Sequence, residues 1–234
     1  MEETPQHVLV VTPHPDDAEV WCGGTVAKWI KEGAEVNYVL CTDGGKGSDI
    51  PGITSKELSK TREQEQLDAA QVLGVKHVEM LHIPDGEIED TADFRKALVR
   101  QIRLVKPEVV LVTEPYRRNS SWHRDHRIAG QVALDAVFPY ARDHLHFMDL
   151  WENEGLEPHK TGTVLFWGAE QANTFIDITS AVDIKTEAVK AHRSQMSGRT
   201  DAEITEFVLN LAKGVGEENG YGYAEAFRKV TFRT

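Results

Sequence analysis

Four short, strongly apolar runs in the first half of the chain constrain its fold more than any other feature. The runs are residues 7–12 (HVLVVT), 35–41 (EVNYVLC), 77–81 and 108–113 (EVVLVT). Each run is too short for a helix and rich in β-branched residues, which is typical of strands buried on both faces. Stretches with helical spacing separate them, at residues 25–31, 54–74 (opened by a capping box of Thr54 and Glu57) and 93–106. Strands that alternate with helices over short connections predict βαβ units and a parallel sheet.

The second half of the chain is less regular, and we expect it to complete the same single domain, residues 1–234. We expect strands at 164–167, 174–178 and within 221–232, and helices at 127–138, 181–196 and 202–213. Between them lies an insertion at about 139–160 that carries Phe147, Met148, Leu150 and Trp151. These side chains are too apolar to lie together in water, so we expect them to be covered by the domain or by a neighbouring subunit.

Composition excludes several classes of protein. The chain of 234 residues has 38 acidic and 26 basic side chains, a formal net charge of −12, which argues against nucleic-acid binding. The only cysteines, Cys22 and Cys41, exclude a disulfide framework and a four-cysteine zinc site. The N-terminus does not resemble a signal peptide, and no apolar stretch is long enough for a membrane span. We therefore expect a cytoplasmic protein.

Histidines and aspartates gather in the loops that leave the first and fourth predicted strands. They are His14, Asp16 and Asp17 in the first loop, and His123, Asp125 and His126 in the other. Ligands of open parallel sheets bind beyond the carboxyl ends of the strands, where these loops lie. Two imidazoles and one carboxylate can hold a catalytic zinc ion with one position left open. Within each loop, one residue can bind the metal while another serves as an acid or a base.

The residues alone leave three interpretations open. The first is a zinc hydrolase, which the adjacent second aspartate favours because it offers a ready base. The second is a non-haem Fe(II) enzyme, because two histidines and one carboxylate also form that site. The third is a non-catalytic sugar-binding α/β domain.

Four segments of the sequence together resemble the LmbE-like family. They are HPDDAE at 14–19 followed by GGT at 23–25, Arg62-Glu63 in a helix that ends in Leu73-Gly74, HRDH at 123–126, and AHRSQ at 191–195. They occur in the order that is typical of the family. The family includes PIG-L (N-acetylglucosaminyl-phosphatidylinositol de-N-acetylases), deacetylases of the mycothiol and bacillithiol pathways, and diacetylchitobiose deacetylases.

The resemblance implies a three-layer, Rossmann-like α/β fold, with a mostly parallel sheet and helices on both faces. It also implies a zinc-dependent hydrolase that removes the acetyl group from a small N-acetylated amino sugar or glycoconjugate. Zn²⁺ would be bound by His14, Asp17 and His126. Asp16 would be the general base, His123 the general acid and Asp125 the residue that orients an imidazole, while Arg62, Asp85 and His192 would bind substrate.

Relatives are often trimers or hexamers, so the resemblance also implies a homo-oligomer. The sequence departs from the family near the substrate. Arg124 stands where many relatives carry proline, and the loop at 117–122 lacks a glycine-rich or aspartate-rich approach. These departures leave open which N-acetylated compound is the substrate.

Overall fold

A seven-stranded sheet forms the centre of the computed structural model, which describes residues 3–119, 123–196 and 198–233. The strands are β1 (His7–Thr12), β2 (Glu35–Thr42), β3 (His77–Ile83), β4 (Val109–Thr113), β5 (Thr163–Trp167), β6 (Thr174–Asp177) and β7 (Ala224–Thr231). Their order is β3-β2-β1-β4-β5-β7-β6. The strands β1 to β5 pair in parallel, whereas β7 is antiparallel to both of its neighbours.

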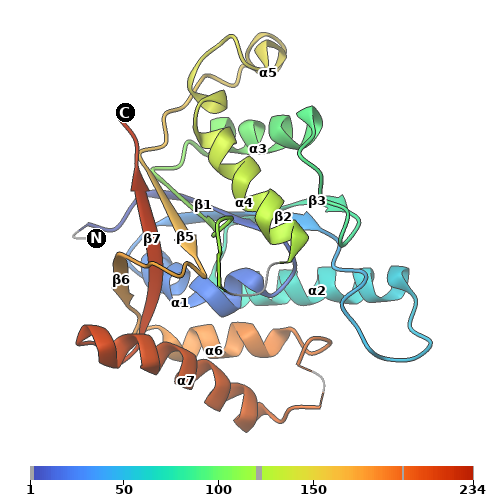
Figure 1. Cartoon of the computed structure of the whole chain (residues 1–234), viewed down its shortest axis with the longest axis vertical. Coiled ribbons are helices and arrows are strands. Elements are labelled where there is room, and N and C mark those ends of the chain that lie inside the picture. Colours follow the sequence, from blue (N-terminus) through green and yellow to red (C-terminus); the bar gives the residue numbers. More distant parts are fainter. Residues whose placement is uncertain (1–2, 120–122, 197, 234) are drawn as a thin grey trace.

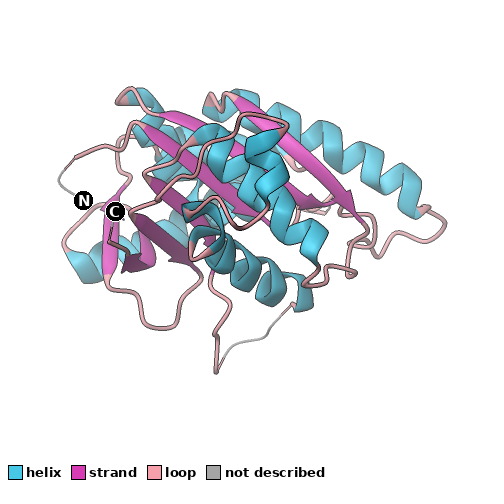
Figure 2. Ribbon diagram, turned by 90° about the horizontal axis from the view of Figure 1, so that it is seen from above, coloured by secondary structure: helices cyan, strands magenta, loops and turns pink. Residues whose placement is uncertain are grey.

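Helices cover both faces of the sheet. They are α1 (Asp17–Lys31), α2 (Ser55–Leu73), α3 (Ala92–Val105), α4 (Arg124–Val137), α5 (Met148–Glu152), α6 (Val182–Ala191) and α7 (Asp201–Asn219). One face carries α3 and α4, and the other carries α1, α2, α6 and α7 (Figure 1). The strands twist between these layers (Figure 2). The structure therefore confirms a three-layer α/β fold with a mostly parallel sheet.

The two central strands explain why the sequence folds in this way. All five residues of β4 and five of the six residues of β1 are buried, because helices cover both faces at this point. Burial of such aliphatic side chains stabilises the fold by about 25 cal/mol for each Å² removed from water. The edge strand β3 is only partly buried, in keeping with its more polar sequence.

Helix α1 begins at Asp17, eight residues earlier than the expected start at residue 25. The Gly23-Gly24 pair does not interrupt the helix but allows a close approach. A Cβ atom on Gly24 would lie 2.5 Å from Cδ1 of Ile178. The backbone N–H groups of Gly24 and Thr25 donate to the Glu225 carboxylate at 2.9 and 2.7 Å. Packing against the C-terminal part of the chain therefore requires glycine at position 24, whereas a Cβ atom on Gly23 would lie at an ordinary distance of 3.6 Å from Lys185.

Three other helix boundaries differ from the expectation by three residues or more, and one of them is the end of α7, at Asn219 rather than at residue 213. Helix α4 begins at Arg124 rather than at residue 127, because the His123 side chain caps it by accepting from the backbone N–H of Asp125. Helix α6 ends at Ala191 rather than at residue 196. The segment after α6 instead forms turns that bring Ser194 to Glu65 of α2.

The 139–160 insertion is anchored to α3 by one buried side chain. It contains a short 3₁₀ helix, η1 (Tyr140–Arg142), and α5. Arg103 of α3 is fully buried, and its guanidinium donates to five backbone carbonyl oxygens of the insertion at 2.7–3.4 Å. These are the carbonyl oxygens of Tyr140, Ala141, Asp143, His146 and Phe147. This contact satisfies the buried charge and fixes the path of the segment.

The apolar side chains of the insertion are only partly covered within one chain. Leu150 is fully buried, and Phe147 packs against the core. By contrast, Met148 is 44% exposed and Trp151 is 38% exposed. The domain itself therefore covers two of the four side chains, and coverage of Met148 and Trp151 by a neighbouring subunit stays a prediction. They lie on the outer side of α5, which is too short to bury more than one face.

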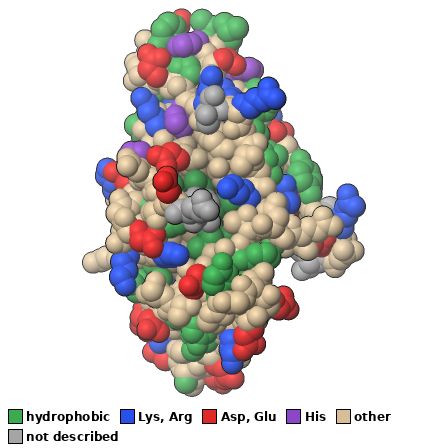
Figure 3. Space-filling view, turned by 90° about the vertical axis from the view of Figure 1, so that its left-hand side faces the viewer, with side chains coloured by type: hydrophobic (Ala, Val, Ile, Leu, Met, Phe, Trp, Pro, Cys, Tyr) green, Lys and Arg blue, Asp and Glu red, His purple; other side chains and the backbone are tan. Residues whose placement is uncertain are grey.

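Acidic and basic side chains are interspersed over the face shown in Figure 3, and histidines gather at the end that carries the insertion. Among the helices that the structure describes, none combines the length and apolar character that a membrane crossing requires.

Candidate metal centre and active site

The candidate site lies at the carboxyl ends of β1 and β4, where the strand order reverses direction. From β1 the chain passes to β2 and β3 on one side, and then returns to β4 on the other. Val11 of β1 lies beside Val112 of β4, so the loops that follow these strands leave the sheet together. This is the position at which open α/β sheets bind ligands.

Three side chains from these loops converge on one point. Nδ1 of His14 lies 3.1 Å from Oδ2 of Asp17 and 3.2 Å from Nε2 of His126. Oδ2 of Asp17 lies 3.0 Å from Nε2 of His126. Donors that surround a tetrahedral zinc ion at about 2.0–2.1 Å are about 3.3 Å apart. The three donors therefore fit a divalent cation after a small outward movement. A cation would also give a bonding partner to Nδ1 of His14 and Nε2 of His126, which face each other.

The second nitrogen of His14 is held by carboxylates. Nε2 lies 3.1 Å from Oδ2 of Asp125 and 3.4 Å from Oδ1 of Asp85. Asp125 is fully buried and also accepts from the backbone N–H groups of Gly86 and Ile88, at 2.7 and 3.3 Å. A carboxylate that holds the outer nitrogen of a metal-binding imidazole fixes its orientation. Asp125 occupies that position relative to His14.

A second group of possible ligands comprises His14, Asp85, His123 and Asp125. Both oxygens of Asp125 already accept backbone N–H groups, and His123 is half exposed. The group of His14, Asp17 and His126 is therefore the better candidate for a metal.

The electrostatics of the site favour positive charge. Burial alone would lower the pKa of His14, but hydrogen bonds with the carboxylates of Asp125, Asp17 and Asp85 raise it to about 11. Burial would likewise raise the pKa of Asp17, yet the contacts with His126 and His14 hold it well below its usual range. The pKa of Asp85 falls to about 2, because its hydrogen bond with His14 outweighs its burial. Three carboxylates, those of Asp17, Asp85 and Asp125, thus lie around His14 and favour its charged form.

Asp16 is close to this centre but outside the converging donors. Its backbone has φ = 96° and ψ = −31°, a conformation that is strained for a residue other than glycine. Burial, followed by the neighbouring charge of Asp17, raises the pKa of Asp16 to about 7. Its nearest cationic group is Nη2 of Arg62, at 3.6 Å. A carboxylate with a pKa near neutrality has the properties of a general base.

The ring of His123 stands edge-on to that of His14, with the ring centroids 4.6 Å apart. Nδ1 of His123 accepts the Asp125 backbone N–H at 3.2 Å. Burial and the adjacent His14 lower the pKa of His123. Since 48% of its side chain is exposed, His123 is the imidazole of the site that a substrate can reach most easily.

Arg62, which the resemblance assigns to substrate binding, is only 3% exposed. Its guanidinium donates to the carbonyl oxygens of Gly44 and Pro15, at 2.9 and 2.6 Å. It therefore ties the loop after β2 to the loop after β1. Asp85, by contrast, lies beside His14 and receives the Lys46 backbone N–H at 3.1 Å.

His192, the third residue assigned to substrate, is fully buried behind the site. Its Nε2 lies 3.1 Å from Oε2 of Glu19. Oε1 of Glu19 accepts from Nε2 of Gln66 at 3.0 Å, and Oε1 of Gln66 accepts the Asp16 backbone N–H at 3.4 Å. His192 thus contacts the interior of the protein, through Glu19 of helix α1.

Sequence reasoning missed the supporting residues of the site. Glu19 lies within the HPDDAE motif but carried no assigned role, and Gln66 lies one helical turn after Arg62. Thr113 ends β4, and its Oγ1 lies 3.4 Å from Nδ1 of His126 and accepts from Arg117 at 3.2 Å. The one feature of the sequence that pointed to Thr113 was its position at the end of a predicted strand. Residues 120–122 of the approach loop lie outside the described residues.

Comparisons with known proteins agree with this geometry. A diacetylchitobiose deacetylase from Thermococcus kodakarensis is 34% identical over 95% of this chain and 82% of its own length. A probable N-acetyl-alpha-D-glucosaminyl L-malate deacetylase 2 from Bacillus subtilis is 27% identical over 82% of this chain and 85% of its own.

Among solved structures, N,N'-diacetylchitobiose deacetylase from Pyrococcus horikoshii, complexed with its inhibitor MPG, superposes with a TM-score of 0.88. It is 31% identical, and the match covers 97% of this chain and 84% of that one. The PIG-L family model, described as GlcNAc-PI de-N-acetylase, matches residues 9–137, which is more than half of the chain. The chain belongs to the PIG-L family.

Proposed function

We propose that this protein is a zinc-dependent deacetylase that hydrolyses the N-acetyl amide of a small amino sugar or glycoconjugate. The observation that carries the proposal is the convergence of His14, Asp17 and His126, whose donor atoms lie within 3.0–3.2 Å of one another. Deacetylases of N-acetylated sugars among the relatives support the same reaction and substrate class. Two imidazoles and one carboxylate, with a fourth position left open, are a ligand set that is typical of catalytic zinc.

We assign the steps of the reaction to residues around these ligands. A divalent ion held by the three side chains would supply Lewis-acid activation of the acetyl carbonyl and of the attacking water. Asp16 takes a proton from that water, for which its pKa of about 7 is suited. His123 returns a proton to the departing amine, and Asp125 keeps His14 in its orientation by accepting at 3.1 Å.

Amine release measures this function directly. The purified protein is incubated with N-acetylglucosamine, N,N'-diacetylchitobiose and N-acetylglucosaminyl malate, and the metal content of the same preparation is determined. We expect about one zinc ion per chain, loss of amine release on chelation and its recovery with added zinc. Amine release that survives complete removal of metal would contradict the proposal. Iron in place of zinc, together with oxygen dependence, would instead identify the non-haem Fe(II) alternative.

We further propose that the chain forms a homo-oligomer, a trimer or a hexamer, through the outer side of the insertion. Leu145 is 82% exposed, and Met148 and Trp151 of the same insertion are also exposed. These apolar side chains would be covered in such an assembly. Sedimentation of the wild-type protein and of a Leu145→Glu, Met148→Glu variant measures the effect. We expect a stable oligomer for the former and a smaller species for the latter. A wild-type monomer would contradict this proposal.

A further inference from the structure

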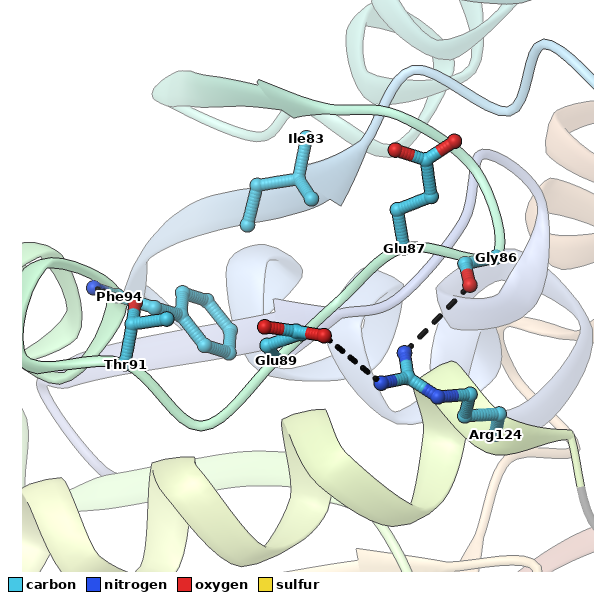
Figure 4. A pocket seen from close by; sticks show the side chains of 7 residues that line it. All are labelled: Ile83, Gly86, Glu87, Glu89, Thr91, Phe94 and Arg124. Atoms are coloured by element: carbon cyan, nitrogen blue, oxygen red, sulfur yellow. Dashed lines mark hydrogen bonds and ion pairs between the residues drawn. The ribbon is translucent and has the colours of Figure 1, made fainter.

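The surroundings of the candidate site differ on the two faces of the sheet. On the face that carries α3 and α4, a groove lies beside the site, and Arg124 points across it toward Gly86 (Figure 4). On the face that carries α1 and α2, the polar side chains of Glu19, Gln66 and His192 are fully buried. Burial of polar groups is costly unless their bonds are made within the protein, so the bonds of these three side chains indicate what they do.

The peptide group between Pro15 and Asp16 is held from both sides by α2. Nη2 of Arg62 donates to the Pro15 carbonyl oxygen at 2.6 Å, and Oε1 of Gln66 accepts the Asp16 N–H at 3.4 Å. Arg62 and Gln66 lie four residues apart and therefore on the same face of the helix. Because the peptide group is planar, the two contacts together fix its rotation. That rotation determines φ of Asp16, which is 96° and needs such support in a residue other than glycine.

Glu19 fixes which way the amide of Gln66 points. A carboxylate can only accept hydrogen bonds, so the amide nitrogen of Gln66 must face Oε1 of Glu19, at 3.0 Å. The amide oxygen of Gln66 is thereby directed at the Asp16 N–H. The other oxygen of Glu19, Oε2, lies 3.1 Å from Nε2 of His192. The order of contacts is thus His192, Glu19, Gln66 and the Asp16 backbone.

The same helix also holds the far end of this series. Glu65, the neighbour of Gln66 in α2, accepts from the backbone N–H and the hydroxyl of Ser194, both at 2.7 Å. His192 lies two residues before Ser194, so α2 fixes its position as well as that of Asp16. The series therefore begins and ends on one rigid element.

We propose that Gln66 is a positioning residue for the reaction, which holds the strained backbone of Asp16 and with it the direction of the Asp16 carboxylate. Glu19 and His192 keep the amide of Gln66 in the required orientation. The proposal rests on the proposed function, because it takes Asp16 to be the group that accepts the proton from water. Since none of the three side chains is accessible to a substrate, their loss affects the chemical step rather than substrate binding.

The test is Gln66→Met, which keeps the length of the side chain but removes both of its hydrogen bonds. Zinc content, melting temperature, and kcat and KM for amine release from N,N'-diacetylchitobiose are measured on one preparation. We expect full zinc content and a KM within about twofold of the wild-type value. The value of kcat should fall by about tenfold or more, because a small displacement of a catalytic group is costly. The matched control is Gln101→Met, the same change at a buried position of α3, which should keep kcat within about twofold.

A double-mutant cycle separates positioning from a general effect on structure. Gln66→Met is combined with Asp16→Asn, which removes the carboxylate that Gln66 directs. In this background we expect Gln66→Met to lower kcat by less than about twofold, because there is no base left to displace. An equal fall of kcat in both backgrounds would overturn the proposal. A wild-type kcat in the single Gln66→Met variant would overturn it as well.

An exchange of side chains keeps the test decisive if Gln66→Met does not fold. Glu19→Gln alone lets the amide of Gln66 bond in either orientation and should lower kcat. Adding Gln66→Glu to that variant restores one carboxylate and one amide to the pair, with an oxygen again facing the Asp16 N–H, and should recover most of the rate. A folded, zinc-loaded exchange variant that stays as slow as Glu19→Gln would overturn the proposal. These outcomes leave the proposed function intact, whereas absence of amine release from the zinc-loaded wild-type protein would overturn both.

Discussion

Replacing His14 by alanine is expected to abolish metal binding and amine release together. Its Nδ1 lies within 3.2 Å of both other proposed ligands, and its Nε2 is held by Asp125, so the change removes one of three donors and its support. An ion held by two donors is lost readily. Because a catalytic metal contributes several kcal/mol, the rate should fall by about 10³-fold or more. Elemental analysis and amine release are measured on the same sample.

The matched control for this variant is His77→Ala, which removes an imidazole that is 60% exposed on β3. It should keep both zinc and activity. His126→Ala should resemble His14→Ala, because it removes another member of the same group of donors. Full zinc occupancy in either ligand variant would show that the metal is bound elsewhere.

Replacing Asp16 by asparagine should separate metal binding from catalysis. The Asp16 carboxylate is not among the three converging donors, so the variant should keep its zinc. Asparagine has the same shape but cannot accept a proton at neutral pH, and the rate should fall by about 10²–10⁴-fold, as is typical of acid–base groups. His123→Ala should behave in the same way, since His123 stands beside the donors with its side chain half exposed.

The converse result would exchange the roles within the first motif. If Asp16→Asn lost its zinc while Asp17→Asn kept it, the ligand would be Asp16. If His123→Ala kept nearly the wild-type rate, another group would supply the proton. His192 could not do so in this arrangement, because it is fully buried against Glu19.

The sequence was sufficient to predict the sheet because its central strands are continuous apolar runs. Such short runs are stable where both faces of the strand are buried, as in the centre of a parallel sheet. The boundary of α1 could not be predicted in the same way. Gly23 and Gly24 lower helix propensity locally, and the contacts that compensate come from Ile178 and Glu225, far along the chain. A local pattern contains no information about such a partner.

Candidate site residues could be identified for a similar reason. His14 and Asp17 follow one buried strand and His126 follows another, so parallel pairing alone brings them together. Whether a side chain is buried or exposed does not follow from the sequence motif that contains it. Arg62 and His192 both belong to segments that resemble the family, yet each is buried by packing between helices that only the folded chain defines.

The anchoring of the insertion by Arg103 has an evolutionary consequence. Within the described residues, its guanidinium donates its hydrogen bonds to backbone carbonyl oxygens, which every amino acid provides. The anchor therefore specifies the path of the segment without specifying its sequence. Outward side chains such as Leu145, which the proposed oligomer would cover, can change together with the surface that they meet while the segment keeps its course. This end of the molecule can thus acquire a new surface by drift or selection, at little risk to the sheet and to the site at the opposite ends of its strands.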